Sequence, residues 1–356
     1  MNTGYCYNFP AVRGTQAGRP FYVATCPLRI IPRIFMFDED ELPADLRAQR
    51  TLNKSRIPEM VNYLVNNPND YIFSALTASV GSEVRFKENI DSTNVGTLSI
   101  PLEAKILIND GQHRRKAIEE AISECPELGH DNIAVLFFID EGLLRSQQMF
   151  ADLNKYAIRP SPSLSTLYDK REESSELARY LAMNVAPFKS FTELERSNIS
   201  VNSGKLFTLS GIKQASRALL GKKPKDNYTS EDQEKAASYW TKVFENIDEW
   251  RMIYHKELSA VEARKDLIVV HGLGLHALGT LGNTLLKKYP ENWESILKEL
   301  KKIDWRKANP EFQKRSMLHG KLSKAQTNIT LTANYLKLQL GIELTDDELL
   351  IEEKVN

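Results

Sequence analysis

The stretch Lys105-Ile-Leu-Ile-Asn-Asp-Gly-Gln-His-Arg-Arg-Lys-Ala117 predicts a strand, a tight turn and the start of a helix. The apolar run at 106–108 is typical of the end of a buried strand, and Asn109-Asp110-Gly111 is typical of a turn. Apolar residues then recur at 117, 118, 121, 122 and 125, which is helical spacing. The polar run at 112–116 therefore falls in the first turn of the helix.

The charge of this first turn is unusual. Three cations at 114–116 follow His113 at a helix N-terminus, which already carries roughly half a positive charge. Asp110 can cap one or two free N–H groups there, but it cannot neutralise the cations. A phosphate approaching over Gly111 and held by arginines would resolve the conflict. A solvated basic turn paired with acids elsewhere explains the charge equally well, and no Walker A or Gly-x-Gly-x-x-Gly pattern is present.

The run Asp110-Gly-Gln-His-Arg114 resembles the signature of the DGQHR-domain proteins, and among them the DndB family. That family is encoded with the DNA phosphorothioation machinery, which places sulfur in the DNA backbone. Two further features match in order: Arg50-x-x-Asn53-x-x-Arg56 before the turn and Met149-Phe-Ala-Asp-Leu-Asn-Lys155 after it. The resemblance is strong over the first half of the chain. More distantly, the turn looks like the phosphate-binding corner of ParB-like and sulfiredoxin-like folds.

The resemblance implies a phosphate or nucleic-acid site that extends beyond the turn. Its members would be Asp110, Gly111, Gln112, His113, Arg114 and Arg115, with Arg50, Arg56, Asn154 and Lys155 as further contacts. From the residues alone, Arg50 and Arg56 fit a solvated helix start equally well. Asn154 and Lys155 also fit a role in capping the last carbonyls of their own helix.

Composition excludes several classes of protein. The chain has 356 residues, and its 47 basic residues balance 47 acidic ones, so any case for nucleic acid rests on local patches. No signal peptide and no apolar run of about 18 residues appear, so we expect a cytoplasmic protein without membrane contact. The three cysteines are far apart, which argues against disulfides and a cysteine metal site. Cys26 beside Arg29 is redox-sensitive if its pKa is lowered, although a small buried hydrophobe is favoured.

We expect an α+β chain with two domains. Residues 1–165 form a DGQHR, ParB-like mixed α/β domain, and residues 166–356 form a mainly helical domain; the boundary follows Arg159-Pro-Ser-Pro162. In the first domain, prolines predict edge strands within 21–37, and Ile133–Ile139 predicts a fully buried central strand. Further predictions are a helix at 57–66, a strand at 71–80, a hairpin at 84–100 and a helix opened by Gly142. In the second, we predict a hairpin at 188–207 and helices at 164–185, 209–220, 230–254, 269–288, 292–303 and 322–340.

The helical half separates its charges. Residues 287–324 hold eleven Lys and Arg against five acids, and residues 341–356 hold six acids and one Lys. Aromatic residues are interleaved with these cations, a mixture used for backbone contact and stacking on nucleic acid. Because of the resemblance to the DndB family, we expect DNA contact here through Lys301, Lys302, Arg306 and Lys307, with Tyr289, Trp293, Trp305 and Phe312 nearby. The alternative, favoured for a generic chain, is a solvated surface whose aromatics belong to the core. The glycines from 272 to 282 predict close approach of another helix.

The resemblance implies a DNA-binding transcriptional regulator, most simply a repressor, of the phosphorothioate modification genes. Its partners would be double-stranded promoter DNA, other phosphorothioation proteins and further copies of itself, and the one candidate cofactor is a nucleotide. No recognition helix of a helix-turn-helix is evident. The alternative is a nucleotide-binding or nucleotide-hydrolysing enzyme of the same or a linked anti-phage system, with His113 as acid or base, Arg114 and Arg115 as the clamp, and Asp110 as cap or metal-side carboxylate. No second carboxylate for magnesium stands out, and a purely architectural partner is the third hypothesis.

Overall fold

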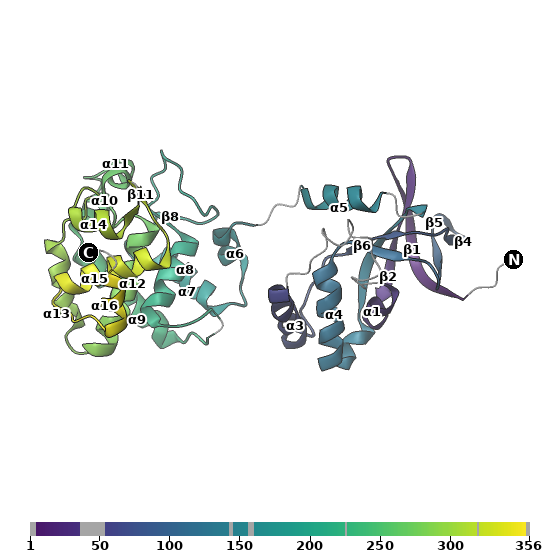
Figure 1. Ribbon diagram of the computed structural model, residues 1–356, viewed down its shortest axis with the longest axis horizontal. Coiled ribbons are helices and arrows are strands. Elements are labelled where there is room, and N and C mark those ends of the chain that lie inside the picture. The colour runs from purple at the N-terminus through teal and green to yellow at the C-terminus, as the bar shows by residue number, and fades with distance from the viewer. Residues whose placement is uncertain are drawn as a thin grey trace. The chain divides into compact units, whose positions relative to one another are not determined.

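The computed structural model describes residues 5–35, 54–141, 145–155, 160–224, 226–318 and 320–353. The chain forms two compact units, Met1–Ile158 and Arg159–Asn356 (Figure 1). A mixed sheet lies in the first unit, and helices dominate the second. The predicted α+β class, a mixed α/β half followed by a helical half, is therefore confirmed.

The first unit alternates strands and short helices. In chain order it contains β1 (Cys6–Gln16), β2 (Arg19–Pro27), η1 (Leu28–Ile30), α1 (Ile31–Ile34), η2 (Lys54–Arg56), α3 (Ile57–Asn66), β3 (Leu76–Val80), β4 (Arg85–Asn89), β5 (Ser92–Pro101), β6 (Ile106–Asp110), α4 (Gln112–Glu124), η3 (Pro126–His130), β7 (Asn132–Ile139) and α5 (Ser146–Lys155). The predicted helix at 57–66 and the hairpin formed by β4 and β5 are confirmed. The strand predicted at 71–80 is confirmed only for its second half.

One seven-stranded sheet has the order β4-β5-β1-β2-β7-β3-β6. Neighbouring strands are antiparallel except β3 and β7, which are parallel. β7 therefore joins two groups of strands, β4-β5-β1-β2 on one side and β3-β6 on the other.

Two predictions about individual strands need correction. The edge strands expected within 21–37 are wrong, because β2 lies inside the sheet between β1 and β7. Pro20 and Pro27 stand near the two ends of β2, where a missing N–H disrupts the ladder least. β7 is a central strand as predicted, but it is not fully buried. Val135 and Phe137 are buried whereas Ala134 is exposed, so only one face of this strand is closely covered.

Helices α1, α3 and α4 lie together on one face of the sheet (Figure 1). The apolar face of α3 contributes Ile57, Val61 and Leu64 to the core beneath them. Side chains alternate along β6, so Ile106 and Ile108 enter this same core. The next residues of β6, Asn109 and Asp110, follow directly from the core and are thereby fixed in place.

The second unit consists of short and medium helices. It contains α6 (Pro162–Tyr168), α7 (Glu173–Asn184), β8 (Thr192–Glu193), β9 (Phe207–Thr208), α8 (Leu209–Leu220), α9 (Ser230–Glu245), α10 (Asp248–Tyr254), α11 (Ala260–Asp266), α12 (Gly272–Lys288), α13 (Trp293–Leu297), η5 (Lys298–Lys302), α14 (Pro310–Arg315), β10 (Met317–Leu318), β11 (Lys321–Leu322), α15 (Gln326–Gln339) and α16 (Asp346–Glu352). The helices predicted at 209–220, 269–288 and 322–340 are present as α8, α12 and α15. The hairpin predicted at 188–207 is wrong, because β8 and β9 pair in parallel.

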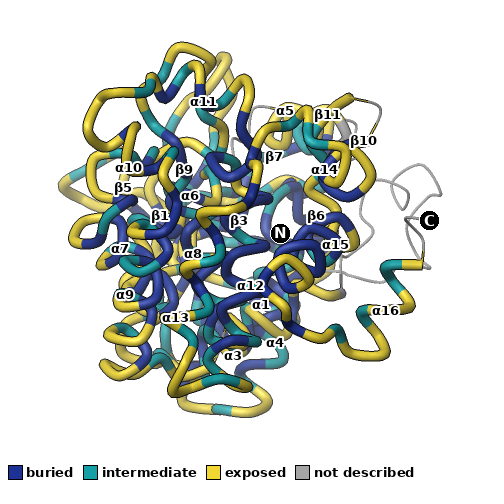
Figure 2. Tube along the Cα trace, turned by 90° about the vertical axis from the view of Figure 1, so that its left-hand side faces the viewer, coloured by how far each residue is buried: buried dark blue, intermediate teal, exposed yellow. Residues whose placement is uncertain are grey.

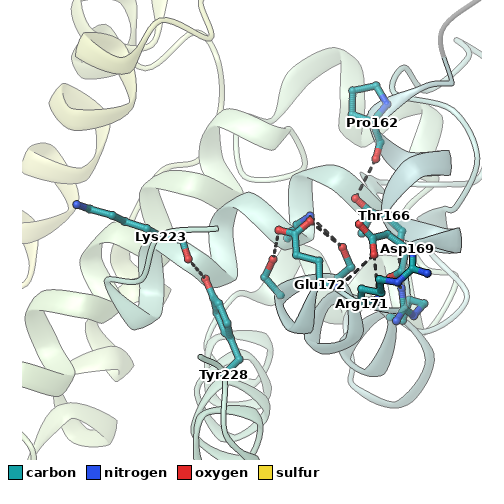
Figure 3. A network of polar contacts seen from close by, with 11 residues as sticks. Pro162, Thr166, Asp169, Arg171, Glu172, Lys223 and Tyr228 are labelled. Atoms are coloured by element: carbon teal, nitrogen blue, oxygen red, sulfur yellow. Dashed lines mark hydrogen bonds and ion pairs between the residues drawn. The ribbon is translucent and has the colours of Figure 1, made fainter. Parts of the chain in front are cut away.

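The helix predicted at 164–185 is interrupted between α6 and α7. Figure 3 shows the polar contacts at this break. The Asp169 carboxylate accepts hydrogen bonds from the backbone N–H groups of Arg171 (2.9 Å) and Glu172 (3.1 Å). An aspartate that binds the backbone two residues ahead favours a turn over a continuing helix. Glu172 then forms an ion pair with Lys213 of α8, with 2.6 Å between Oε2 and Nζ, and this contact joins the interrupted segment to α8. The span predicted at 230–254 is likewise divided, into α9 and α10.

Helix α12 is buried along most of its length (Figure 2) and packs against α8. A Cβ added at Gly279 would overlap the carbonyl oxygen of Ala215 and lie 3.0 Å from its carbonyl carbon. A Cβ added at Gly282 would lie 2.5 Å from Cζ of Tyr239. The prediction that these small residues permit close helix approach is confirmed.

Among the described residues, no helix combines the length and the apolar composition that a membrane span requires.

Candidate phosphate-binding site

The predicted strand-turn-helix is present: β6 ends at Asp110, and α4 begins at Gln112. Gly111 is the N-cap residue of α4, and no side chain caps this helix end. The expectation that Asp110 caps it is wrong, because the Asp110 carboxylate instead accepts from Nη2 of Arg114 at 2.8 Å. The N-terminus of α4 therefore has no side-chain cap from either Asp110 or Gly111, and an anion is the usual alternative partner of such a helix end.

Gly111 has a φ of +105°, which side-chain-bearing residues rarely adopt. A Cβ at this position would overlap the Leu76 side chain and lie 3.0 Å from Nη2 of Arg114. The glycine thus allows both the turn and the approach of the arginine.

Arg114 is held at the turn by two acceptors. Besides the bond to Asp110, its Nη2 donates to the carbonyl of Ala75 at 3.2 Å, just before β3. Its Nε is buried and has no hydrogen-bond partner among the described residues. The guanidinium is therefore oriented in advance beside the start of α4.

Arg115 and Lys116 are engaged in contacts within the first unit. Arg115 donates to the carbonyl of Pro32 at 2.9 Å and pairs with Glu119 at 3.1 Å. Lys116 pairs with Glu119 at 3.1 Å and Glu120 at 3.6 Å. At these two positions the structure therefore shows the predicted alternative, in which the basic residues pair with acids. Because Arg115 is buried, its cation stabilises the packing of α4 near Pro32.

His113 and Arg56 lie close enough to interact electrostatically. Burial lowers the pKa of His113 below its usual value of 6.5, and the charges of Arg56 and Arg114 lower it further, while Asp110 opposes them. Arg56 is exposed at the N-cap of α3. Its predicted partner in the same motif, Arg50, lies outside the described residues. The neighbourhood of His113 thus carries a positive potential that an anion would relieve.

Gln112 is the first residue of α4 and is only 8 % exposed. Its Nε2 is buried without a hydrogen-bond partner among the described residues. A buried amide donor without an acceptor costs roughly 1–3 kcal/mol, so such groups usually have a partner. Gln112 is the second donor group of this helix start that lacks a described partner.

Beside the turn, a buried polar cluster lies on the side of β6 that faces α5. The amide of Asn109 donates to Oγ of Ser79 at 2.6 Å and accepts from Oγ of Ser146 at 2.8 Å. Met149 adds a sulfur 3.9 Å from the same amide. This cluster was not predicted from the sequence; the polar Asn109 directly after three apolar strand residues was the available signal. The cluster joins the start of α5 to the strand that carries the turn.

Asn154 and Lys155 end α5. The amide of Asn154 donates to the carbonyl of Phe150 at 2.8 Å and so closes the last turn of its own helix. For Asn154 the structure thus shows the predicted alternative, a side chain that caps a carbonyl of its own helix. The described ties between α5 and β6 come instead from Ser146 and Met149.

The basic region of the second unit differs from expectation in part. Trp305 and Phe312 are fully buried and stack on each other. The prediction that these two rings stack on nucleic acid is therefore wrong. Lys307 donates to the carbonyls of Arg264 (2.6 Å) and Lys265 (2.8 Å), which occupies its ammonium inside the fold. Tyr289 and Trp293 are partly buried against the same core.

Three of the predicted cations remain on the surface. Lys302 pairs with Glu299 at 2.5 Å and Arg306 pairs with Asp304 at 2.7 Å, yet their side chains are 75 % and 70 % exposed. Lys301 is also exposed. Part of the acidic tail lies inward: Glu348 pairs with Lys337, and Glu352 pairs with Arg315. The acidic α16 therefore neutralises cations of α14 and α15.

Cys26 is fully buried, and burial raises the pKa of its thiol to about 12. The alternative of a thiol activated by nearby arginines is therefore wrong. The neutral thiol is a small core side chain.

The arrangement can bind an anion. It offers uncapped N–H groups, the positive potential around His113 and the donor of Gln112. Among the described residues, no three His, Cys, Asp or Glu side chains gather as metal ligands. The carboxylate at the turn, Asp110, is already paired with Arg114.

Replacing Gly111 with alanine should destabilise the protein by about 2 kcal/mol, because strained φ and overlap with Leu76 add together. Gly18 is a matched control, since its φ is +73° and no atom lies near an added Cβ. Gly18→Ala should cost only the backbone term, on the order of 1 kcal/mol. Urea denaturation of both variants measures the difference, and equal losses would contradict the packing argument.

No curated protein and no solved structure is matched, so the distant resemblance to ParB-like and sulfiredoxin-like folds stays a prediction. One family model matches residues 9–343, nearly the whole chain; it is DndB, described as DNA-sulfur modification-associated.

Proposed function

The chain belongs to the DndB family of DNA-sulfur modification-associated proteins, and from this membership we propose that it binds duplex DNA and represses the genes of that system. The observation that carries the proposal is the uncapped N-terminus of α4, with Arg114 oriented beside it. Helix N-termini bind phosphate oxygens through N–H groups, and such contacts position a protein on DNA.

Residues around the turn can act together on one phosphate. Backbone N–H groups of α4 donate to its oxygens, and Arg56 adds an exposed charge from the start of α3. An anion would also favour the protonated form of His113, whose pKa is lowered by burial and by the neighbouring cations. Arg115 is not needed as a ligand, since it holds the fold.

The second unit supplies further cations for the same role. The ion pairs of Lys302 and Arg306 are exposed, and exposed pairs contribute at most about 1 kcal/mol. These side chains can therefore exchange their acids for DNA phosphates at little cost. Lys301 adds a third exposed charge, whereas Lys307 is committed to carbonyls.

Arg56→Ala should weaken duplex binding about tenfold and reduce the slope of log affinity against log salt by about 0.9, the value for one lost phosphate contact. Arg85→Ala is the matched control, because Arg85 is an exposed cation of the same unit on β4. Fluorescence anisotropy with labelled promoter duplex at several salt concentrations measures both quantities. An Arg56→Ala protein with the slope of the Arg85→Ala protein would show that Arg56, at the start of α3, makes no phosphate contact.

A combined Lys301→Glu, Lys302→Glu and Arg306→Glu protein tests the second unit in the same titration. Retention of wild-type affinity would confine DNA contact to the first unit. Absence of duplex binding by the wild type at low salt would overturn the proposal. Nucleotide turnover that disappears in Arg114→Ala would support the enzymatic alternative instead.

A further inference from the structure

A pocket of about 490 Å³ lies within the helical unit, far along the chain from the turn at Asp110. Residues 197–201, the start of α8, α11 and the start of α12 line it. Its volume is in the range of small-molecule sites. Among the described residues that line it, none is an aspartate or a glutamate, while several are basic.

Three permanent cations define one wall: Arg264, Lys265 and Lys324. Arg264 donates to the carbonyls of Val201 (2.8 Å), Ser200 (3.3 Å) and Lys205. All three acceptors are uncharged, so these hydrogen bonds do not neutralise the guanidinium. Lys265 and Lys324 are exposed, and neither forms an ion pair within the described part of the chain. Elsewhere in this unit, cations are commonly paired with acids. The wall therefore has an excess of positive charge.

The imidazole of His271 is affected by the same excess of positive charge. Burial, together with the charges of Lys307, Arg264 and Lys324, lowers the pKa of its imidazole to about 4, although the hydrogen bond to the backbone of Arg264 opposes the shift. Its Nε2 donates to the carbonyl of Arg264 at 2.9 Å. His271 is also the N-cap residue of the 17-residue α12, and no side chain caps that helix. The positive end of α12 thus faces the wall that already lacks carboxylates.

The rest of the pocket is mainly apolar, with polar side chains at Ser197, Asn198 and Thr208. Leu206, Phe207 and Leu275 are buried side chains that reach its lining. Ser197 adds a hydroxyl whose oxygen is buried and has no hydrogen-bond partner among the described residues. A ligand suited to these walls combines an anionic head with a flat, largely apolar body that carries hydrogen-bonding groups.

We propose that this pocket binds a small organic phosphate of mononucleotide size, with the phosphate at Lys265, Lys324 and the start of α12 and the body against Phe207 and Leu275. The proposal is independent of the DNA contact at α4, because none of its residues belongs to that site. Two sources share this chemistry: a free mononucleotide and the 5′-phosphorylated end of a DNA strand.

Isothermal titration calorimetry on the full chain, with adenosine 5′-monophosphate as the probe, tests the proposal. We expect saturable binding that is at least about tenfold tighter than that of adenosine or inorganic phosphate alone, because each half engages only one wall. A Lys265→Gln, Lys324→Gln protein should lose about tenfold in affinity. A Lys287→Gln, Lys298→Gln protein is the matched control, since both lysines are exposed in the same unit and line other pockets.

Competition then separates the sources. A 5′-phosphorylated oligonucleotide that displaces the mononucleotide, where the unphosphorylated oligonucleotide does not, assigns the site to DNA ends. Failure of the phosphorylated oligonucleotide to compete assigns it to free nucleotides. The proposal is overturned if neither adenosine 5′-monophosphate nor the 5′-phosphorylated oligonucleotide binds. It is also overturned if the two double variants bind adenosine 5′-monophosphate with equal affinity while thermal melting shows that both are folded.

Discussion

Gly279→Ala should destabilise the protein by about 3 kcal/mol, although alanine is the better helix former by roughly 1 kcal/mol. The reason is the contact between α12 and α8. An added methyl would overlap the carbonyl oxygen of Ala215, and a backbone oxygen inside a helix cannot move aside alone. The two buried helices would have to separate, which opens the apolar core around them.

Thermal and urea denaturation measure the effect, with an expected fall in Tm on the order of 8 °C. Gly272→Ala is the control on the same helix, because nothing lies within 4 Å of a Cβ added there. The stability of the Gly272→Ala protein should change by less than about 1 kcal/mol. If both variants show the same small change, the close approach at Gly279 contributes no constraint.

The stability of the protein should fall by about 3 kcal/mol between pH 7 and pH 4 through His271 alone. The pKa of this histidine is lowered from 6.5 to about 4 in the folded state. The unfolded chain therefore takes up a proton first as the pH falls. The stabilisation is fully present above pH 6.5 and is lost as the pH falls toward 4, because the buried ring beside Arg264 resists protonation.

His271→Gln removes the titration and can keep the donor to the carbonyl of Arg264. The variant should lose about 3 kcal/mol less than the wild type over the same pH interval in urea denaturation. Carboxylates that titrate at low pH contribute equally to both proteins and cancel. His255→Gln is the control, because His255 is exposed at the end of α10. A His271→Gln protein with the acid sensitivity of the wild type would show that the imidazole is protonated without penalty.

Local signals in the sequence predicted local structure well. The apolar spacing of Ile57, Val61 and Leu64 located α3, and Asp110-Gly111 located the turn before α4. Asp169 illustrates a local signal that apolar spacing alone conceals, since its side chain ends α6 inside an otherwise helical pattern. Strand neighbours are a different matter. The position of β2 between β1 and β7 depends on pairing between Phe21 and Phe138, which no local pattern encodes.

The candidate site follows the same division. Gly111 and Arg114 are predicted by the turn itself, but the partner of Arg114 at Ala75 and the cluster of Ser79 and Ser146 come from segments distant in sequence. In the basic region, the alternation of cations and aromatics resembled a binding surface. Burial of Trp305 and Phe312 shows that one face of that pattern forms the core, and sequence alone does not decide which face turns inward.

The position of β7 between β2 and β3 has a consequence for the order of assembly. β7 is the last strand of its sheet along the chain, yet both neighbours are made earlier, so the sheet stays in two pieces until residue 139 has emerged from the ribosome. Its pairing with β2 and β3 is separated by more than 50 residues of chain in each case, as Thr25↔Ala134 and Leu76↔Val135 show. Such non-local pairing slows folding. The turn at Asp110 is synthesised before β7, but the strand that supports it is locked into the sheet only afterwards. A nascent chain would therefore acquire its phosphate site late, after the final strand closes the gap.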